Sequence, residues 1–207
     1  MRTKSNYYKL IVVLVSAYGL YEHLLVGIAK YGLNIFYFFT VLSNIGVFLY
    51  YIFFGFRENP KRLRLKSYLL LPILLTGVVN WFILLPVSLK VYGSILPLFQ
   101  PSNFFVHGLI PLLFLLDWFL FDPKGIYTAK EPLKWCILPY VYIVVIYVRA
   151  YFGGPVFDNT LYPYPFFDPK QMNGWTNVWL MLIFLNVAYL IVGYLLYSKK
   201  AVKQIKG

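Results

Sequence analysis

The chain has 207 residues, of which 60% are hydrophobic and only 13% are charged, and its formal net charge is +12. So few polar residues cannot cover a soluble globule, which excludes a cytosolic enzyme and a disordered regulator. Because Cys136 is the single cysteine, a disulfide scaffold is excluded as well. The composition is that of a polytopic membrane protein.

A transmembrane helix needs about 20 mostly apolar residues, since the hydrocarbon core is about 30 Å thick and each helical residue rises about 1.5 Å. Six stretches meet this length, approximately residues 7–29, 34–56, 67–89, 103–121, 135–152 and 175–197. Runs such as LIPLLFLLDWFLF are apolar on every side and do not fit the alternating strands of an outer-membrane barrel. We therefore predict an all-α polytopic membrane protein, in which residues 1–207 form one domain with six transmembrane helices.

The basic residues are distributed unevenly among the connections between these stretches. Fifteen of the 19 Lys and Arg fall at the chain ends, between the second and third stretches, or between the fourth and fifth. They are Arg2, Lys4, Lys9, Arg57, Lys61, Arg62, Arg64, Lys66, Lys124, Lys130, Lys134, Lys199, Lys200, Lys203 and Lys206. The alternate connections carry Lys30, Lys90, Arg149 and Lys170. The positive-inside rule then predicts a multi-pass cell-membrane protein with both termini in the cytoplasm. The positive charge is explained by anionic lipid head groups on that side, and no nucleic acid partner is needed.

Polar side chains inside the apolar stretches are informative, because an ionisable group in hydrocarbon is costly unless it is paired or hydrated. At about 1.5 Å per residue, Thr40 lies about 9 Å, His107 about 6 Å and Glu22 about 10 Å below the outer ends of their helices. Asn80 lies somewhat deeper on the third helix, and Arg149 lies near the outer end of the fifth. Five helices thus bring polar groups to one depth in the outer leaflet, which indicates a site.

Several of these residues also have an ordinary structural interpretation. Thr40, Ser43 and Asn44 share one helix face at i, i+3 and i+4, where they can line a site or hydrogen-bond between membrane helices. Arg149 can bind a substrate carboxylate or extend toward the membrane surface.

His107 can act as a general base, as a metal or haem ligand, or as a packing residue. A metal site is disfavoured because the chain has two His and Cys136 lies at the cytoplasmic end, so we predict no metal and no cofactor. Glu22 and His23 can serve the site or face the aqueous boundary. Asp117 lies about 15 Å along the helix from His107, too far to orient it, and is expected to pair with a basic loop residue.

The second and fourth apolar stretches contain the segments FFTVLSN at residues 38–44 and HGLIPLLFLLD at residues 107–117. These two segments resemble the androgen-induced protein family, multi-pass membrane hydrolases that include the androgen-dependent regulator of tissue factor pathway inhibitor. The family pattern has a threonine in an aromatic-rich stretch, then a histidine, a nearby proline and an acidic residue ten positions after the histidine. Tyr164-Pro165-Phe166 is similar to the family's Tyr-Pro-Phe segment before the last helix. The resemblance spans most of the chain at low identity.

The resemblance implies a threonine-dependent hydrolase of fatty acid esters of hydroxy fatty acids. In the family, the threonine and the histidine form the catalytic pair, and they fall here on Thr40 and His107. The eukaryotic pattern has a second histidine shortly before the catalytic one, where this chain has NFFV at residues 103–106, and its proline comes one residue later than Pro111. The short loops are those expected of a bacterial member.

The chemistry of these residue types supports the same roles. A threonine hydroxyl is a poor nucleophile unless a base accepts its proton, and a neutral imidazole at the same depth can do so. We therefore predict Thr40 as nucleophile and His107 as general base, with the hydroxyl and a ring nitrogen about 3–3.5 Å apart.

Supporting roles can be assigned to the remaining polar groups at this depth. The candidates for stabilising an oxyanion are Asn80, Asn44 and Ser43. Glu22 is the carboxylate at the right depth to orient the histidine. Arg149 is expected to bind the carboxylate of a lipid or fatty-acyl ester substrate.

Two other functions remain possible from the sequence. A small transporter or lipid-binding protein would use the outer polar cluster as a ligand site, although such transporters often show internal repeats, and none is found here. A structural partner subunit would tolerate loss of Thr40 as well as it tolerates loss of Ser43.

Overall fold

The computed structural model describes residues 2–57 and 59–201 of the chain. These residues form helices joined by turns and loops, and the strand-like pairing among them is an isolated bridge between Phe157 and Thr160. Five helices in this part of the chain are long and apolar enough to cross a membrane: Thr3–Tyr37, Pro60–Leu84, Pro101–Phe121, Glu131–Phe152 and Trp175–Lys200. The all-α class is therefore confirmed, and the helices indicate a multi-pass membrane protein.

Most of the long helices consist of several pieces. The α-helices are α1 (Arg2–Tyr31), α2 (Phe39–Tyr50), α3 (Pro60–Val78), α4 (Leu85–Tyr92), α5 (Pro101–Phe104), α6 (Ile110–Phe121), α7 (Glu131–Trp135), α8 (Ile137–Phe152) and α9 (Trp175–Lys200). The π-helices are η2 (Tyr51–Gly55), η3 (Val79–Leu84) and η5 (Phe105–Leu109). The 3-10 helices are η1 (Gly32–Tyr37), η4 (Leu96–Phe99) and η6 (Pro165–Phe167). The predicted stretch 34–56 is interrupted, and its helical part, Phe39–Gly55, is shorter than the five long helices.

The third predicted helix begins several residues earlier than position 67. Asn59 caps it, since its side chain accepts a hydrogen bond from the Arg62 backbone N–H at 3.0 Å, and Pro60 occupies the first turn. Lys66 therefore belongs to α3 and is fully buried, whereas the sequence suggested a residue in an exposed connection.

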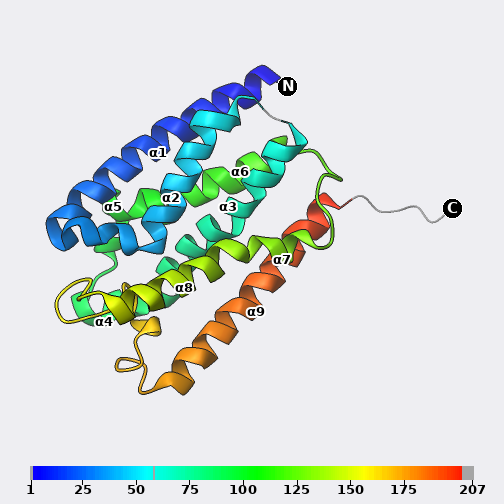
Figure 1. Ribbon diagram of the computed structural model, residues 1–207. Helices are drawn as coiled ribbons and strands as arrows, with labels where there is room; N and C mark the ends of the chain where they lie inside the picture. The colour runs from blue at the N-terminus through cyan, green and yellow to red at the C-terminus, as the bar shows by residue number, and fades with distance from the viewer. Residues whose placement is uncertain (1, 58, 202–207) are drawn as a thin grey trace.

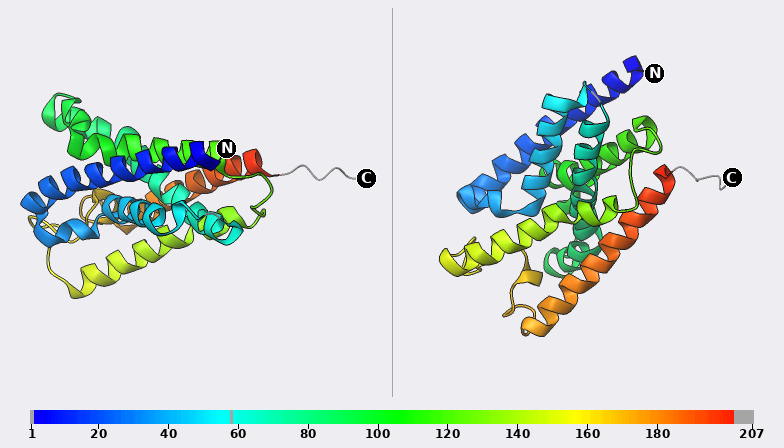
Figure 2. Two further views of the ribbon diagram at one scale, coloured as in Figure 1. Left: turned by 90° about the horizontal axis from the view of Figure 1, so that it is seen from above. Right: turned by 45° about the vertical axis from the view of Figure 1, so that its right-hand side comes forward.

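The helices run lengthwise between two ends of an elongated bundle (Figures 1 and 2). The first turn of α1 and the last turn of α9 lie at the same end, which we call the terminal end. The central helix is α3, which packs against α2, α6, α7, α8 and α9. Near the terminal end α7 packs against α9, and α8 and α9 separate toward the opposite end (Figure 1).

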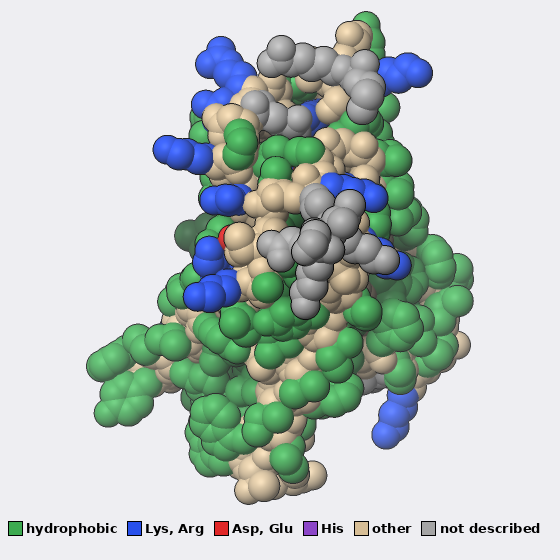
Figure 3. All heavy atoms as spheres, turned by 90° about the vertical axis from the view of Figure 1, so that its right-hand side faces the viewer, with side chains coloured by type: hydrophobic (Ala, Val, Ile, Leu, Met, Phe, Trp, Pro, Cys, Tyr) green, Lys and Arg blue, Asp and Glu red, His purple; other side chains and the backbone are tan. Residues whose placement is uncertain are grey.

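Positive charge is concentrated at the terminal end. Figure 3 views the molecule from this side, and Lys and Arg side chains gather over its upper part while few acidic side chains are visible. Lys203 and Lys206, two of the tail lysines, lie outside the described residues. The charge asymmetry of the sequence thus corresponds to one end of the fold.

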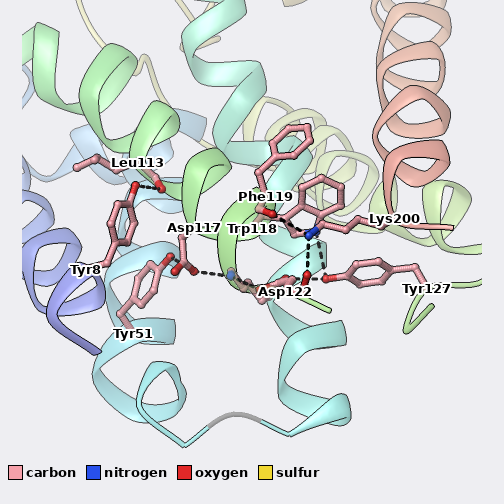
Figure 4. Close-up of polar contacts among 10 residues, drawn as sticks. Tyr8, Tyr51, Leu113, Asp117, Trp118, Phe119, Asp122, Tyr127 and Lys200 are labelled. Carbon is pink, nitrogen blue, oxygen red and sulfur yellow. Dashed lines mark hydrogen bonds and ion pairs between the residues drawn. The ribbon is translucent and has the colours of Figure 1, made fainter. Parts of the chain in front are cut away.

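A buried ionic cluster lies beneath this basic surface (Figure 4). Lys66 forms an ion pair with Asp117 and a second one, at 2.6 Å, with Asp122, and none of the three charged groups is exposed. Tyr51 donates its hydroxyl to Asp117 Oδ2 at 2.8 Å. Asp117 therefore pairs with a basic residue, as expected, but that residue lies in α3 and not in a loop.

The last residue of α9 closes the same cluster from the other side (Figure 4). The Lys200 ammonium donates to the carbonyl oxygens of Phe119, at 3.0 Å, and Asp122, and it lies 5.0 Å from the centre of the Trp118 ring. Tyr127 donates its hydroxyl to Asp122 Oδ2 at 2.8 Å. Burial raises the pKa of the Asp122 carboxyl and the pKa of the Tyr127 phenol. The cluster ties α3, α6 and α9 together at the terminal end.

Candidate active site

Thr40 lies in the first turn of α2. The apolar stretch breaks just before it, because Phe38 is extended, with φ −80° and ψ 130°. The ring of Phe38 packs against Tyr31, Phe157 and Tyr164, with ring centres 4.9, 6.2 and 5.7 Å away. Backbone N–H groups in a first helical turn have no partner within the helix. Thr40 therefore presents both a hydroxyl and a backbone N–H that the helix does not use.

His107 lies in the π-helix η5, directly before α6. Pro111 follows four residues later and has no N–H to donate to the His107 carbonyl. Trp81 Nε1 donates to that carbonyl oxygen at 3.1 Å. Helix α3 approaches closely at Gly77, where a Cβ atom would lie 2.8 Å from the same oxygen. The backbone that carries the imidazole is thus held by α3 and η3, in a π segment of the kind often found at functional sites.

The side chains of Thr40 and His107 meet across α2 and η5. The Thr40 hydroxyl oxygen lies 3.1 Å from His107 Nε2, inside the expected range, and the two residues are only 5% and 9% exposed. His107 Nδ1 lies 3.1 Å from the Asn103 carbonyl oxygen. Because a carbonyl can only accept, Nδ1 carries the proton and Nε2 accepts from the Thr40 hydroxyl. The imidazole is therefore in the tautomer that a general base requires.

Tyr164 also contacts the Thr40 hydroxyl, although the sequence assigned it no role. Its phenol oxygen lies 3.4 Å from Thr40 Oγ1 and accepts from the Thr40 backbone N–H at 3.3 Å. Burial raises the pKa of the Tyr164 phenol, so the group keeps its proton at neutral pH and can donate it. The signal that could have found it is Tyr164-Pro165-Phe166, the segment that carries part of the family resemblance.

The three predicted oxyanion donors differ in their environments. Asn80 is 3% exposed and lines the cavity beside Thr40, and its Nδ2 makes no hydrogen bond within the described part of the chain. Asn44 Nδ2 donates to the carbonyl oxygens of Thr40, at 2.8 Å, and Val106, at 3.1 Å, and so ties α2 to η5. Ser43 is buried and does not line the cavity. Asn80 is therefore the one of the three that can donate to a bound ligand.

The orienting role expected of Glu22 is taken by a backbone group. The Nδ1 proton of His107 points to the Asn103 carbonyl, so no ring N–H is left for a carboxylate. His23 packs beside the site, with its ring centre 5.9 Å from that of His107 and its Nδ1 at hydrogen-bond distance from the Ser102 carbonyl. Residues 102 and 103 precede η5, and the sequence gives no sign that their carbonyls point back to histidines.

Arg149 binds the backbone of the loop between α8 and α9. Its two terminal nitrogens donate to the carbonyl oxygens of Leu161, at 2.9 Å, and Pro155, at 3.2 Å. The guanidinium also stacks over the Tyr37 ring, 4.7 Å from its centre. Arg149 therefore braces the loop between α8 and α9, the loop that carries Tyr164, and its binding of a substrate carboxylate stays a prediction.

A cavity of about 530 Å³ opens beside the Thr40–His107 pair. One part of its wall is polar and is formed by Thr40, His107, Asn80 and Tyr164. The remainder is mostly apolar and comes from α3, α8, α9 and the loop that ends in η6. No Lys, Arg, Asp or Glu is among the described residues that line it. The arrangement can activate a hydroxyl next to an uncharged, lipid-compatible space.

Within the described residues, no group of three or more His, Cys, Asp or Glu is placed to hold a metal ion. Comparisons of the chain with protein-family models, with curated proteins and with solved structures give no match.

Proposed function

We propose that this protein is a membrane-embedded carboxylic ester hydrolase that uses Thr40 as nucleophile and His107 as general base. The observation that supports this most strongly is the 3.1 Å hydrogen bond between the buried Thr40 hydroxyl and His107 Nε2 at the edge of an apolar cavity. A packing histidine would need neither the correct tautomer nor a neighbouring space for a ligand.

The reaction follows from the hydrogen bonds of the site. His107 Nε2 takes the hydroxyl proton while Thr40 Oγ1 attacks the ester carbonyl carbon, which becomes tetrahedral. The carbon–oxygen bond to the alcohol then breaks, and the alcohol leaves with the proton from Nε2. Water enters, gives a proton to the same nitrogen, and attacks the acyl group on Thr40. The acid is released and the hydroxyl regains its proton.

Three donors are available for the negative oxygen of the tetrahedral intermediate. They are Asn80 Nδ2, the Tyr164 hydroxyl and the Thr40 backbone N–H. The N–H lies in the first turn of α2, where the helix dipole also favours negative charge. Asn80 is the strongest candidate, because its Nδ2 has no competing bond among the described residues.

The substrate that fits the cavity is a fatty-acyl ester. The wall is mostly apolar and carries no charged residue in the described chain, so an acyl chain is accepted and an ion is not. The resemblance to the androgen-induced protein family supports the same class, with fatty acid esters of hydroxy fatty acids as its members. Because Arg149 is bonded to the loop, a substrate carboxylate stays outside the cavity, near the head groups.

The proposed membrane arrangement has six crossings, with the short helix Phe39–Gly55 as the second of them. Both termini are cytoplasmic, and the basic terminal end contacts anionic lipid head groups. Thr40 and His107 then lie in the outer leaflet of the cell membrane, shallow enough for water to reach the acyl intermediate.

Turnover of fatty-acyl esters by the purified protein in detergent tests this function. Thr40→Ala and His107→Ala should each abolish turnover, and Ser43→Ala, which removes a buried hydroxyl from the same helix but not from the cavity, should retain it. Equal loss in all three folded variants, or a fully active Thr40→Ala protein, would contradict the assignment.

A lipid-binding protein or small transporter is the second candidate, and the apolar cavity is the observation that favours it. It predicts that esters bind and protect the protein against heat without being hydrolysed. Measuring thermal protection and turnover on the same preparation separates the two functions.

A further inference from the structure

We propose that the acyl chain of the ester lies in the part of the cavity between α8 and α9, that it enters sideways from the membrane, and that Cys136 and Tyr189 end the space. We call this part of the cavity the acyl groove. The proposal rests on the hydrolase function above and adds where the substrate binds and how long a chain it can have.

The cavity extends from the catalytic pair along both helices. On α9 its lining residues run from Trp179 to Tyr189, which at about 1.5 Å per residue is about 15 Å. Along α8 they run from Cys136, the residue just before the helix, to Val144, about 12 Å. The groove is therefore elongated parallel to the helices, which suits an extended chain better than a compact ligand.

The end of the groove near α7 is closed by ordered side chains. Tyr189 is 7% exposed and donates its hydroxyl to the Trp135 carbonyl at 3.0 Å. Cys136 is 2% exposed, and its sulfur lies 3.5 Å from the Pro132 carbonyl oxygen. Because α7 and α9 pack together at this point, a bound acyl chain cannot continue toward the terminal end.

The side of the groove between α8 and α9 is open. The two helices separate away from α7 (Figure 1). Tyr140 and Asn186, which also line the groove, join the two helices by a hydrogen bond. Val144 and Ile183, which line the groove from opposite helices, are 61% and 58% exposed. An acyl chain in the surrounding membrane can therefore pass between the helices without crossing water.

The length of the groove sets the chain length. An extended chain advances about 1.25 Å per carbon, given carbon–carbon bonds of about 1.5 Å, so about 15 Å holds about 12 carbons. Up to that length each methylene should raise kcat/KM by up to about fourfold, the equivalent of about 0.8 kcal/mol. Beyond it the added carbons remain outside and contribute nothing.

The first test is a series of p-nitrophenyl esters from butanoate to hexadecanoate, with the protein in lipid nanodiscs. The wild type should rise in kcat/KM to a plateau near dodecanoate. Leu182→Trp places a large side chain in the groove and should move the plateau to shorter chains. Leu180→Trp, on the same helix but exposed and outside the groove, is the matched control and should keep the wild-type profile.

The second test locates the chain without requiring turnover. A fatty-acyl methyl ester with a terminal diazirine is photolysed with the Thr40→Ala protein, and the cross-linked peptides are mapped by mass spectrometry. Adducts are expected on Cys136, on residues 137–144 of α8 and on residues 179–189 of α9, and the Leu182→Trp substitution should remove them.

The outcomes separate the groove from the catalytic function. If adducts form in the groove but the wild type hydrolyses no ester, the acyl-binding site is supported and the hydrolase function is rejected. If the wild type hydrolyses esters but the adducts form elsewhere, for example on α1, the hydrolase function is supported and the acyl groove is overturned. The same conclusion follows if Leu182→Trp leaves the chain-length profile of hydrolysis unchanged. If the wild type shows no hydrolysis and no adducts form in the groove, both the hydrolase function and the acyl groove are overturned.

Discussion

The polar side chains around Thr40 differ in whether their hydrogen-bond donors already bind another group of the protein. Asn44 uses both protons of its amide to bind backbone carbonyls, and Arg149 uses its terminal nitrogens in the same way. Asn80 Nδ2 has no hydrogen-bond partner in the described chain, although the residue is 3% exposed. A buried donor without a partner is costly to the fold, so its retention suggests a role toward a ligand.

Replacing Asn80 should therefore affect catalysis and stability in opposite directions. In Asn80→Leu, kcat for a fatty-acyl ester should fall by about 10²–10³-fold, the usual effect of losing one oxyanion donor, with KM little changed. The melting temperature in detergent should stay the same or rise, because an unpaired polar group is exchanged for an apolar one of similar size. A lower melting temperature together with unchanged kcat would show that Asn80 is structural.

The proximity of Thr40 and His107 could be predicted from the sequence, but the surroundings of the two residues could not. Thr40 and His107 stand out because hydrocarbon tolerates few polar side chains, and their depths follow from the helical rise. The Asn103 carbonyl that orients the imidazole is a backbone group and leaves no mark in the sequence. Tyr164 lies in a loop, whose path depends on tertiary contacts such as those of Arg149.

Among the helices, the geometry of Thr40 and His107 depends on interruptions within apolar segments. Hydropathy finds the segments, because it counts apolar residues over about 20 positions. It does not find the extended residue at Phe38 that places Thr40 in a first turn. It also does not find η5, where Pro111 leaves the His107 carbonyl to be bound by another helix.

The close approach of α3 to η5 gives a prediction for the helix contact. In Gly77→Ala the new Cβ would lie 2.8 Å from the His107 carbonyl oxygen, so η5 must move. A misplacement of about 1 Å can cost about 100-fold in rate, and kcat should fall by that order while the protein stays folded. Gly46→Ala is the control, since its Cβ would meet only the end of the Leu69 side chain, at 3.0 Å. Equal kcat for both variants would show that the η5 position is not critical.

At the scale of the whole molecule, the buried ionic cluster holds the terminal end together. In Lys66→Met two buried carboxylates, those of Asp117 and Asp122, lose their cation, and the expected loss is about 3–5 kcal/mol of stability. The triple variant Lys66→Met, Asp117→Asn and Asp122→Asn removes the three paired charges together, while Lys200 keeps its carbonyl partners, and this variant should recover most of the lost stability. Thermal unfolding in detergent measures both, and a Lys66→Met protein as stable as wild type would contradict the account.

The proposed orientation of the molecule can be tested in intact cells. In a Cys136→Ser background, a membrane-impermeant maleimide should label Asp158→Cys, in the loop between α8 and α9, from outside. Lys199→Cys, at the end of α9, should be labelled only after permeabilisation, as the cytoplasmic location of the terminal end requires. The reverse labelling pattern would place the basic terminal end outside the cell and Thr40 and His107 toward the cytoplasm.

Covalent labelling tests the proposal that Thr40 is a nucleophile activated by His107. The purified wild type, Thr40→Ala, His107→Ala and Ser43→Ala proteins are treated with a fluorophosphonate probe, and the modified residue is identified by mass spectrometry. We predict an adduct on Thr40 in the wild type and in Ser43→Ala, and none in the other two variants. An adduct on another residue, or labelling of Thr40 that persists in folded His107→Ala, would contradict the claim.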